Sequence, residues 1–130
     1  MPGQQHINPE ALSRSRGYSQ VVKVGNTVYI AGQVSAGVDG NVVGKGDPEA
    51  QVRQIWRNIE AAVKAAGGAS LQNVVKTTTY VTNIQYAAAV RKVREELFQS
   101  SNPPTSTLLV VAGLASPDYM VEIEAIAVVD

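Results

Sequence analysis

The sequence predicts an α+β fold in which two helices pack on one face of a mixed β-sheet. Two segments with helical periodicity alternate with runs rich in β-branched residues, in the order ββ(β)αβαββ. A chain of 130 residues can build one core, and no composition shift marks a linker. We therefore expect one domain over residues 1–130.

The N-terminal third of the chain predicts a hairpin. Residues 1–17 are polar and are expected to be irregular, with His6 among them. Ser19–Val24 and Thr27–Gln33 are rich in β-branched residues, and Gly25-Asn26 between them is a typical hairpin turn. After a further turn, the apolar pair Val42-Val43 could add a short third strand.

The first helix has clear start and stop signals. Asp47 can accept hydrogen bonds from free amides at the helix N-terminus, and Pro48 fits the first helical position. Gly67-Gly68 ends the helix, because glycine tolerates the left-handed conformation of a C-terminal cap. Apolar residues recur at helical spacing in between and form one stripe: Val52, Ile55, Trp56, Ile59, Ala62, Val63 and Ala66.

The second half of the chain repeats the alternation of strand and helix. Val74–Val81 is a predicted strand, and Asn83 can cap a helix that runs to Phe98. The proline pair that follows excludes further helix, and Ser106–Val111 and Met120–Val129 are predicted strands. The inner face of this second helix is expected to carry Tyr86, Val90, Val93 and Leu97.

The last strand is apolar on both faces. Residues alternate between the faces of a sheet, which places Ile126 and Val128 opposite to Val121, Ile123, Ala125, Ala127 and Val129. Two helices can cover one face only. Because monomers rarely expose a large apolar patch, we expect another copy of the chain to cover the second face.

Composition excludes several classes of function. The formal net charge is zero and no stripe of Lys and Arg forms, so nucleic-acid binding is not expected. The absence of cysteine and the single histidine argue against disulfides, thiolate nucleophiles and a metal site. No signal-peptide pattern or membrane-length apolar run is present, so a cytoplasmic protein without membrane contact is expected.

Motifs along nearly the whole chain resemble one known family. They comprise Gly17-Tyr18-Ser19-Gln20, Ile30-Ala31-Gly32-Gln33, Ala65-Ala66-Gly67, Val74-Val75-Lys76-Thr77-Thr78-Thr79-Tyr80-Val81, Asn102-Pro103-Pro104-Thr105-Ser106-Thr107 and Val121-Glu122-Ile123-Glu124-Ala125-Ile126-Ala127-Val128. In this order they resemble the reactive intermediate deaminase (RidA/YjgF) family. The last two correspond to the family's Pro-x-Arg-Ser segment and Glu-Ile-Glu-Ala strand.

The resemblance implies a chorismate-mutase-like α+β fold, assembled as a homotrimer with clefts between subunits. In the family these clefts bind small carboxylates, and many members hydrolyse enamine or imine intermediates to keto acids and ammonia. The resemblance implies neither a metal nor an organic cofactor.

Glu122 is the candidate catalytic residue. A carboxylate at the mouth of a cleft between subunits could orient the attacking water or carry a proton to the leaving nitrogen. The residues alone favour a solvated charge at the end of the strand, because functional carboxylates with a perturbed pKa are the minority. The resemblance favours the catalytic role.

Thr105 stands where active family members place an arginine. A guanidinium binds a carboxylate through two parallel hydrogen bonds, whereas a threonine hydroxyl is one neutral donor. We therefore expect a substrate other than the common 2-imino acids. Arg91 on the second helix is the hypothetical replacement cation, with Arg94 as its neighbour, although both also suit a solvated helix surface.

Four further residues are candidate substrate contacts by resemblance. Tyr18 could close over a ligand, and Gly32 lets backbone approach it closely. Ser106 and Thr107 could add polar contacts. Structural alternatives are a packed tyrosine, a glycine at a bulge, and hydroxyls that pair between strands.

Two functions of different class remain open at this point. The first is hydrolytic deamination of an enamine or imine, with Glu122 as the proton-transfer residue. The second is a non-catalytic binding or regulatory module, which senses or sequesters a small metabolite or acts through protein contacts. Ribonuclease activity is disfavoured, because basic and stacking surfaces are sparse.

Overall fold

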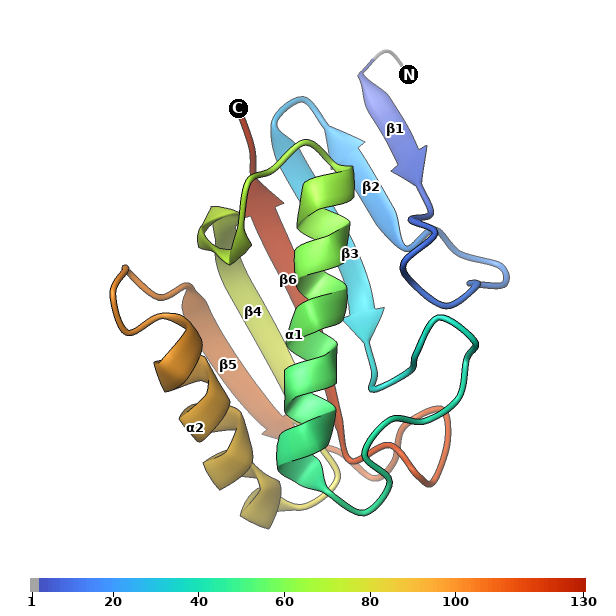
Figure 1. Cartoon of the computed structure of the whole chain (residues 1–130), viewed down its shortest axis with the longest axis vertical. Helices are drawn as coiled ribbons and strands as arrows, with labels where there is room; N and C mark the ends of the chain where they lie inside the picture. Colours follow the sequence, from blue (N-terminus) through green and yellow to red (C-terminus); the bar gives the residue numbers. More distant parts are fainter. Residues whose placement is uncertain (1–2) are drawn as a thin grey trace.

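The computed structural model describes residues 3–130 and shows a six-stranded sheet with two helices (Figure 1). The strands are β1 (Gln4–Ile7), β2 (Val21–Val24), β3 (Thr27–Gln33), β4 (Val74–Val81), β5 (Thr105–Val110) and β6 (Val121–Val128), and the helices are α1 (Pro48–Ala65) and α2 (Ala87–Leu97). The strand order is β1-β2-β3-β6-β4-β5. Only β4 and β5 run parallel, so the sheet is mixed, and the predicted fold class is confirmed.

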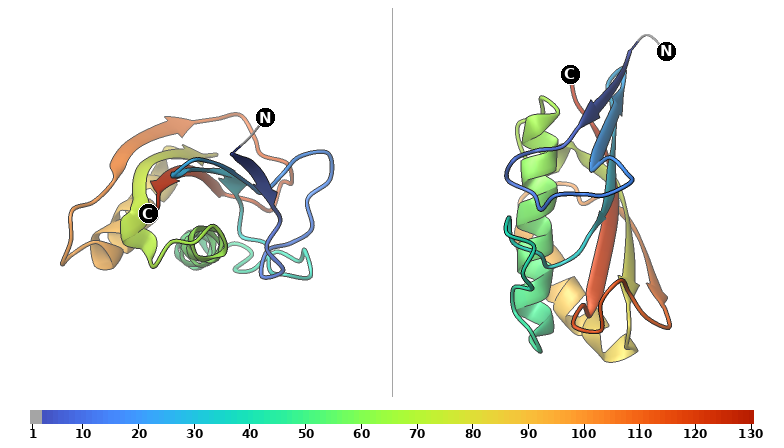
Figure 2. Two further views of the ribbon diagram at one scale, coloured as in Figure 1. Left: turned by 90° about the horizontal axis from the view of Figure 1, so that it is seen from above. Right: turned by 90° about the vertical axis from the view of Figure 1, so that its right-hand side faces the viewer.

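Both helices lie on one side of the curved sheet (Figure 2). Their buried residues join those of the strands in one core cluster, which includes Val52, Ile55, Ile59, Val90 and Val93. In the part of the chain that the structure describes, no helix or strand lies over the opposite side of the sheet (Figure 2). We call that side the open face.

Helix α1 has the predicted caps. The Asp47 side chain accepts a hydrogen bond from the Ala50 amide at 3.1 Å, and Pro48 is the first helical residue. After the helix, Gly67 has φ of 96°, a conformation that glycine adopts at low cost. Capping and the apolar stripe therefore predicted this helix to within a residue.

The N-terminal prediction is wrong in two respects. Residues 4–7 are not irregular but form the edge strand β1, in which His6 pairs with Val22. The Val42-Val43 pair makes no strand, because Val42 has only an isolated bridge to Ala36. An edge strand held by backbone hydrogen bonds needs no apolar residues, so composition could not reveal β1.

The second helix also departs from its prediction. Asn83 caps a 3-10 turn over residues 84–86, and α2 begins only after it. Leu97 is 40% exposed, whereas Phe98 is buried and packs edge-on against Trp56 with ring centroids 5.5 Å apart. Val90 and Val93 are buried as predicted, but the inner face is closed by Phe98, the residue that follows the helix, and not by Leu97.

No helix among residues 3–130 is long and apolar enough to cross a membrane.

A buried glutamine on α1 fixes the loop that enters β6. The Gln51 amide donates to the carbonyls of Gly44 and Asp118, at 3.2 and 2.9 Å. Its side-chain oxygen accepts from the Met120 amide at 2.9 Å. Gln51 is fully buried, so water cannot replace these partners, and the loop enters β6 at a fixed register.

We predict that Gln51→Leu lowers the free energy of unfolding by about 3 kcal/mol, because it leaves three backbone groups without partners. Urea denaturation measures this change. Gln99→Leu is the control, since that side chain is exposed and should change stability by less than about 0.5 kcal/mol. Equal stability of the two variants would contradict the role assigned to Gln51.

Candidate functional site

Ionisable and polar side chains gather on the open face where β6 meets its neighbours. Along β6, Val121, Ile123 and Ala125 are buried under the helices, so Glu122 and Glu124 point to the open face. The register places Tyr80 of β4 opposite Glu122 and Thr78 opposite Glu124. One strand pair therefore carries two carboxylates and two hydroxyls on the same face.

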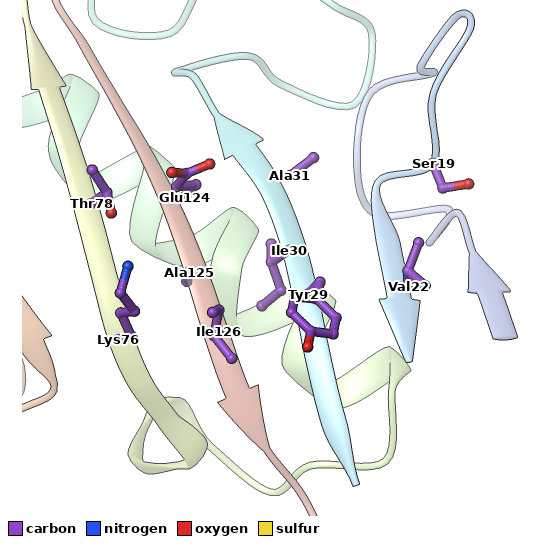
Figure 3. A pocket seen from close by; sticks show the side chains of 10 residues that line it. All are labelled: Ser19, Val22, Tyr29, Ile30, Ala31, Lys76, Thr78, Glu124, Ala125 and Ile126. Atoms are coloured by element: carbon purple, nitrogen blue, oxygen red, sulfur yellow. The ribbon is translucent and has the colours of Figure 1, made fainter. Parts of the chain in front are cut away.

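The open face is hollowed beside Glu124. The hollow has a volume of about 340 Å³ and lies across β2, β3, β6 and β4 (Figure 3). Figure 3 shows the hollow from the open face, with α1 behind the strands; of its lining residues, Ile30 and Ala125 belong to the buried core. It is lined by Ser19, Val22, Tyr29, Ile30, Ala31, Lys76, Thr78, Glu124, Ala125 and Ile126.

Glu122 packs against Gly32 at an irregular point of β3. The β3–β6 register shifts between Ile30 and Gln33, as at a β-bulge. A Cβ atom on Gly32 would collide with the Glu122 carboxylate, so glycine makes room for that side chain. Glu122 is half-buried, and its burial, together with the negative charge of Glu124, raises the pKa of the Glu122 carboxyl.

Glu124 is held by a tyrosine. The Tyr80 hydroxyl donates a hydrogen bond to Glu124 Oε1 at 2.8 Å. This hydrogen bond is the main reason why the pKa of Tyr80 is raised, with smaller effects from burial and from the charges of Glu124 and Glu122. Tyr80 therefore stays protonated and remains a hydrogen-bond donor near neutral pH.

Strand β5 divides the predicted polar contacts between the two faces. Thr105 and Thr107 pair with Lys76 and Thr78 and so share the open face. Thr105 Oγ1 donates to the Val75 carbonyl at 3.2 Å, as a β-strand threonine at a sheet edge can do. Their partners Lys76 and Thr78 line the hollow, so Thr105 and Thr107 lie at its edge.

Ser106 points the other way, toward the helices. It pairs with the buried Thr77 and accepts a hydrogen bond from Arg94 Nη1 at 2.8 Å. Arg91 is exposed on α2, the helix on the side of the sheet opposite to Thr105. Among residues 3–130, Arg94 therefore contacts this segment of β5 through Ser106, whereas Arg91 does not.

Tyr18 lies outside the hollow, in the loop before β2, and is 57% exposed. Its neighbour Ser19 lines the hollow and is hydrogen-bonded to His6, with 2.9 Å between Oγ and Nδ1. Tyr18 also lies near Tyr119, whose pKa is raised mainly by burial and further by Asp118 and Tyr18. Tyr18 therefore approaches the loop that precedes Glu122.

The structure brings together part of the predicted set. Glu122 and Gly32 are in contact, and Thr105 and Thr107 share their face of the sheet. Sequence reasoning missed Tyr80 and the polar lining of the hollow. The sequence did carry a signal, because Lys76, Thr78 and Tyr80 are the less buried residues of β4, just as Glu122 and Glu124 are along β6. The sequence did not give the register between the two strands, which decides which of these residues meet.

Among residues 3–130, no group of three or more His, Asp or Glu side chains could hold a metal ion. The site as described offers carboxyl, hydroxyl and ammonium groups, which suit proton transfer and hydrogen bonding to a small polar molecule.

Comparison with known proteins identifies relatives over most of the chain. A family model described as Endoribonuclease L-PSP matches residues 8–129. A 2-iminobutanoate/2-iminopropanoate deaminase of Dermatophagoides farinae is 37% identical over 113 residues, covering 87% of this chain and 86% of the relative.

Solved structures of the same kind share the fold. RidA from an Antarctic Psychrobacter species aligns with a TM-score of 0.88 and 35% identity, over 96% of this chain and 99% of that one. The YjgF gene product of E. coli aligns with a TM-score of 0.87 and 34% identity, over 95% and 98%. The chain therefore belongs to the RidA/YjgF family, the family of the Endoribonuclease L-PSP model.

Proposed function

We propose that this protein is a hydrolytic deaminase that converts an enamine or imine metabolite into a carbonyl compound and ammonia. The observation that carries the proposal is Glu122, a half-buried carboxyl with a raised pKa that packs against a glycine on the open face. Perturbed carboxyls of this kind are typical of proton-transfer residues. A related protein named as a deaminase of 2-imino acids supports the reaction class.

The proposed chemistry uses Glu122 as a single proton carrier. Protonated Glu122 donates to the imine nitrogen, and water adds to the imine carbon while its proton passes to the Glu122 carboxylate. This gives a carbinolamine. Glu122 then donates to the amine nitrogen, the C–N bond breaks with its electron pair on ammonia, and the hydroxyl proton returns to Glu122. One water is consumed, and Glu122 ends in its starting state.

The proposed substrate carries a carboxylate but differs from the common 2-imino acids. The reason is Thr105, which supplies a hydroxyl where the family's active members have a guanidinium. A charge-assisted hydrogen bond contributes about 1.5–3 kcal/mol, so binding of a simple imino acid should be weakened. Arg91 remains our proposal for a replacement cation, with Tyr18 and Thr107 as further contacts, each contributed from whichever copy of the chain borders the cleft.

The proposed site lies between copies of the chain in a homotrimer. The open face carries Tyr29 at 49% exposure and Val128 at 44%, together with half-buried Ile126. Apolar side chains on an unpartnered sheet face favour association. Copies that cover this face would also enclose the hollow and further desolvate Glu122, which strengthens proton transfer in the site.

Glu122→Gln should lower the rate of imine hydrolysis by about 10²- to 10⁴-fold, because the amide fills the same space but cannot transfer a proton. The assay follows the decay of enzymatically generated 2-iminobutanoate. Glu95→Gln, an exposed carboxylate on α2, should keep the wild-type rate. Equal turnover in wild type and Glu122→Gln would contradict the catalytic role. Ligand binding without turnover of 2-iminobutanoate or of any other enamine or imine tested, in either protein, would favour the binding-module alternative.

Thr105→Arg should tighten binding of 2-oxobutanoate, the hydrolysis product of 2-iminobutanoate, by roughly ten- to a hundredfold, because it adds a charge-assisted contact. Isothermal titration calorimetry measures this change. Thr105→Gln is the control, since it adds length and a donor without charge. If both variants bind as weakly as the wild type, Thr105 does not border the carboxylate site.

Light scattering after size exclusion should give three times the 13.8 kDa mass of the chain. Ile126→Lys should shift the protein toward the monomer, because burying an unpaired ammonium in the interface is costly. Leu97→Lys places the same charge on the helix-covered side and should leave the trimer intact. A monomeric wild type, or a trimeric Ile126→Lys, would oppose assembly through the open face.

A further inference from the structure

Two carboxylates two residues apart on one strand face have different surroundings. Glu124 is exposed and accepts a hydrogen bond from the Tyr80 hydroxyl at 2.8 Å. Glu122 is half-buried, packs against Gly32, and has no side-chain hydrogen bond within residues 3–130. The different environments suggest that the two carboxyls have different roles.

The Tyr80–Glu124 hydrogen bond is diagonal with respect to the strand register. Tyr80 pairs with Glu122, and Glu124 pairs with Thr78. A hydrogen bond from Tyr80 to Glu124 therefore draws the Glu124 carboxylate toward the level of the sheet that Glu122 occupies. The charges of both carboxylates act on Tyr80, which agrees with this clustering.

We infer that Tyr80 and Glu124 form a positioning pair for Glu122. The Tyr80 hydroxyl fixes the Glu124 carboxylate beside Glu122, so that of the two carboxyls Glu122 carries the proton and Glu124 the negative charge. The inference rests on the proposed deamination, in which Glu122 begins and ends each cycle protonated. Tyr80 and Glu124 need not touch the substrate. They act through Glu122.

Two neighbouring carboxylates resist simultaneous ionisation, because each negative charge disfavours the other. The negative charge is better accommodated on Glu124, because a hydroxyl donor binds an ionised carboxylate more strongly than a neutral one and water reaches Glu124 freely. Glu122 lacks both advantages. The proton therefore goes to the residue beside Gly32, where imine chemistry would need a donor.

Two other titratable side chains line the hollow beside Glu124, and they come from β4 and β3. Lys76 on β4 lines the same hollow as Glu124 and favours a negative charge there. Tyr29 on β3 lines the hollow as well. Tyr119, Asp118 and Tyr18, in the loops before β6 and β2, act on one another, and Asp118 pairs with Lys45 at 3.7 Å. The pKa of Glu122 is raised mainly by burial, and the charged neighbour that adds to this effect is Glu124.

The experiment is a carbon-13 NMR titration of side-chain carboxyls in protein labelled at glutamate Cδ, with the Glu122 signal assigned by its loss in Glu122→Gln. In Glu124→Gln the Glu122 midpoint should move to lower pH, because the repulsion is removed while the amide oxygen still accepts from Tyr80. In Tyr80→Phe it should move the same way by less, because Glu124 keeps its charge but is no longer held. Glu95→Gln is the control and should not move it.

The matching kinetic readout is the alkaline limb of the pH–rate profile. Loss of the proton from Glu122 as pH rises ends activity, so this limb should fall to lower pH in the same order of variants. An unmoved Glu122 midpoint in both Glu124→Gln and Tyr80→Phe would overturn the positioning pair, even in an active enzyme. Shifted midpoints in a protein without turnover would uphold the pair and refute the proposed function.

Discussion

The structure depends on one constraint: both helices cover the same face of the six-stranded sheet. Helix α1 packs its apolar stripe over β3 and β6, and α2 closes the same core beside it. That packing fixes which residue of each strand is buried. Every second residue of β4 and β6 is consequently sent to the open face, and Glu122, Glu124 and Tyr80 are placed there together.

The open face has two notable properties. It carries exposed apolar side chains such as Tyr29 and Val128, and it holds a half-buried carboxyl with a raised pKa. Further copies of the chain packed on this face would bury the exposed apolar side chains. They would also raise the pKa of the Glu122 carboxyl further, because desolvation favours the protonated acid. In the proposed account, assembly and catalysis thus share one surface.

Local signals in the sequence were sufficient for most of the fold. Asp47, Pro48 and Gly67 bounded α1, and Gly25-Asn26 located the hairpin, since caps and turns depend on neighbouring residues alone. Strand β1 and the 3-10 turn before α2 were not predicted, because backbone pairing and a single turn leave little trace in hydropathy. For the site, the alternation of residues along β6 placed Glu122 on the correct face. The Tyr80–Glu124 contact could not be predicted, because the two residues are 44 positions apart and meet only through the register between β4 and β6.

The most direct measurement of the central claim is a crystal structure of the protein with bound 2-oxobutanoate. We predict that the keto oxygen, which takes the place of the imine nitrogen, accepts a hydrogen bond from the Glu122 carboxyl, and that another copy of the chain packs on the open face around the ligand. A ligand bound elsewhere, with the open face in solvent and Glu122 remote from any cleft, would contradict it.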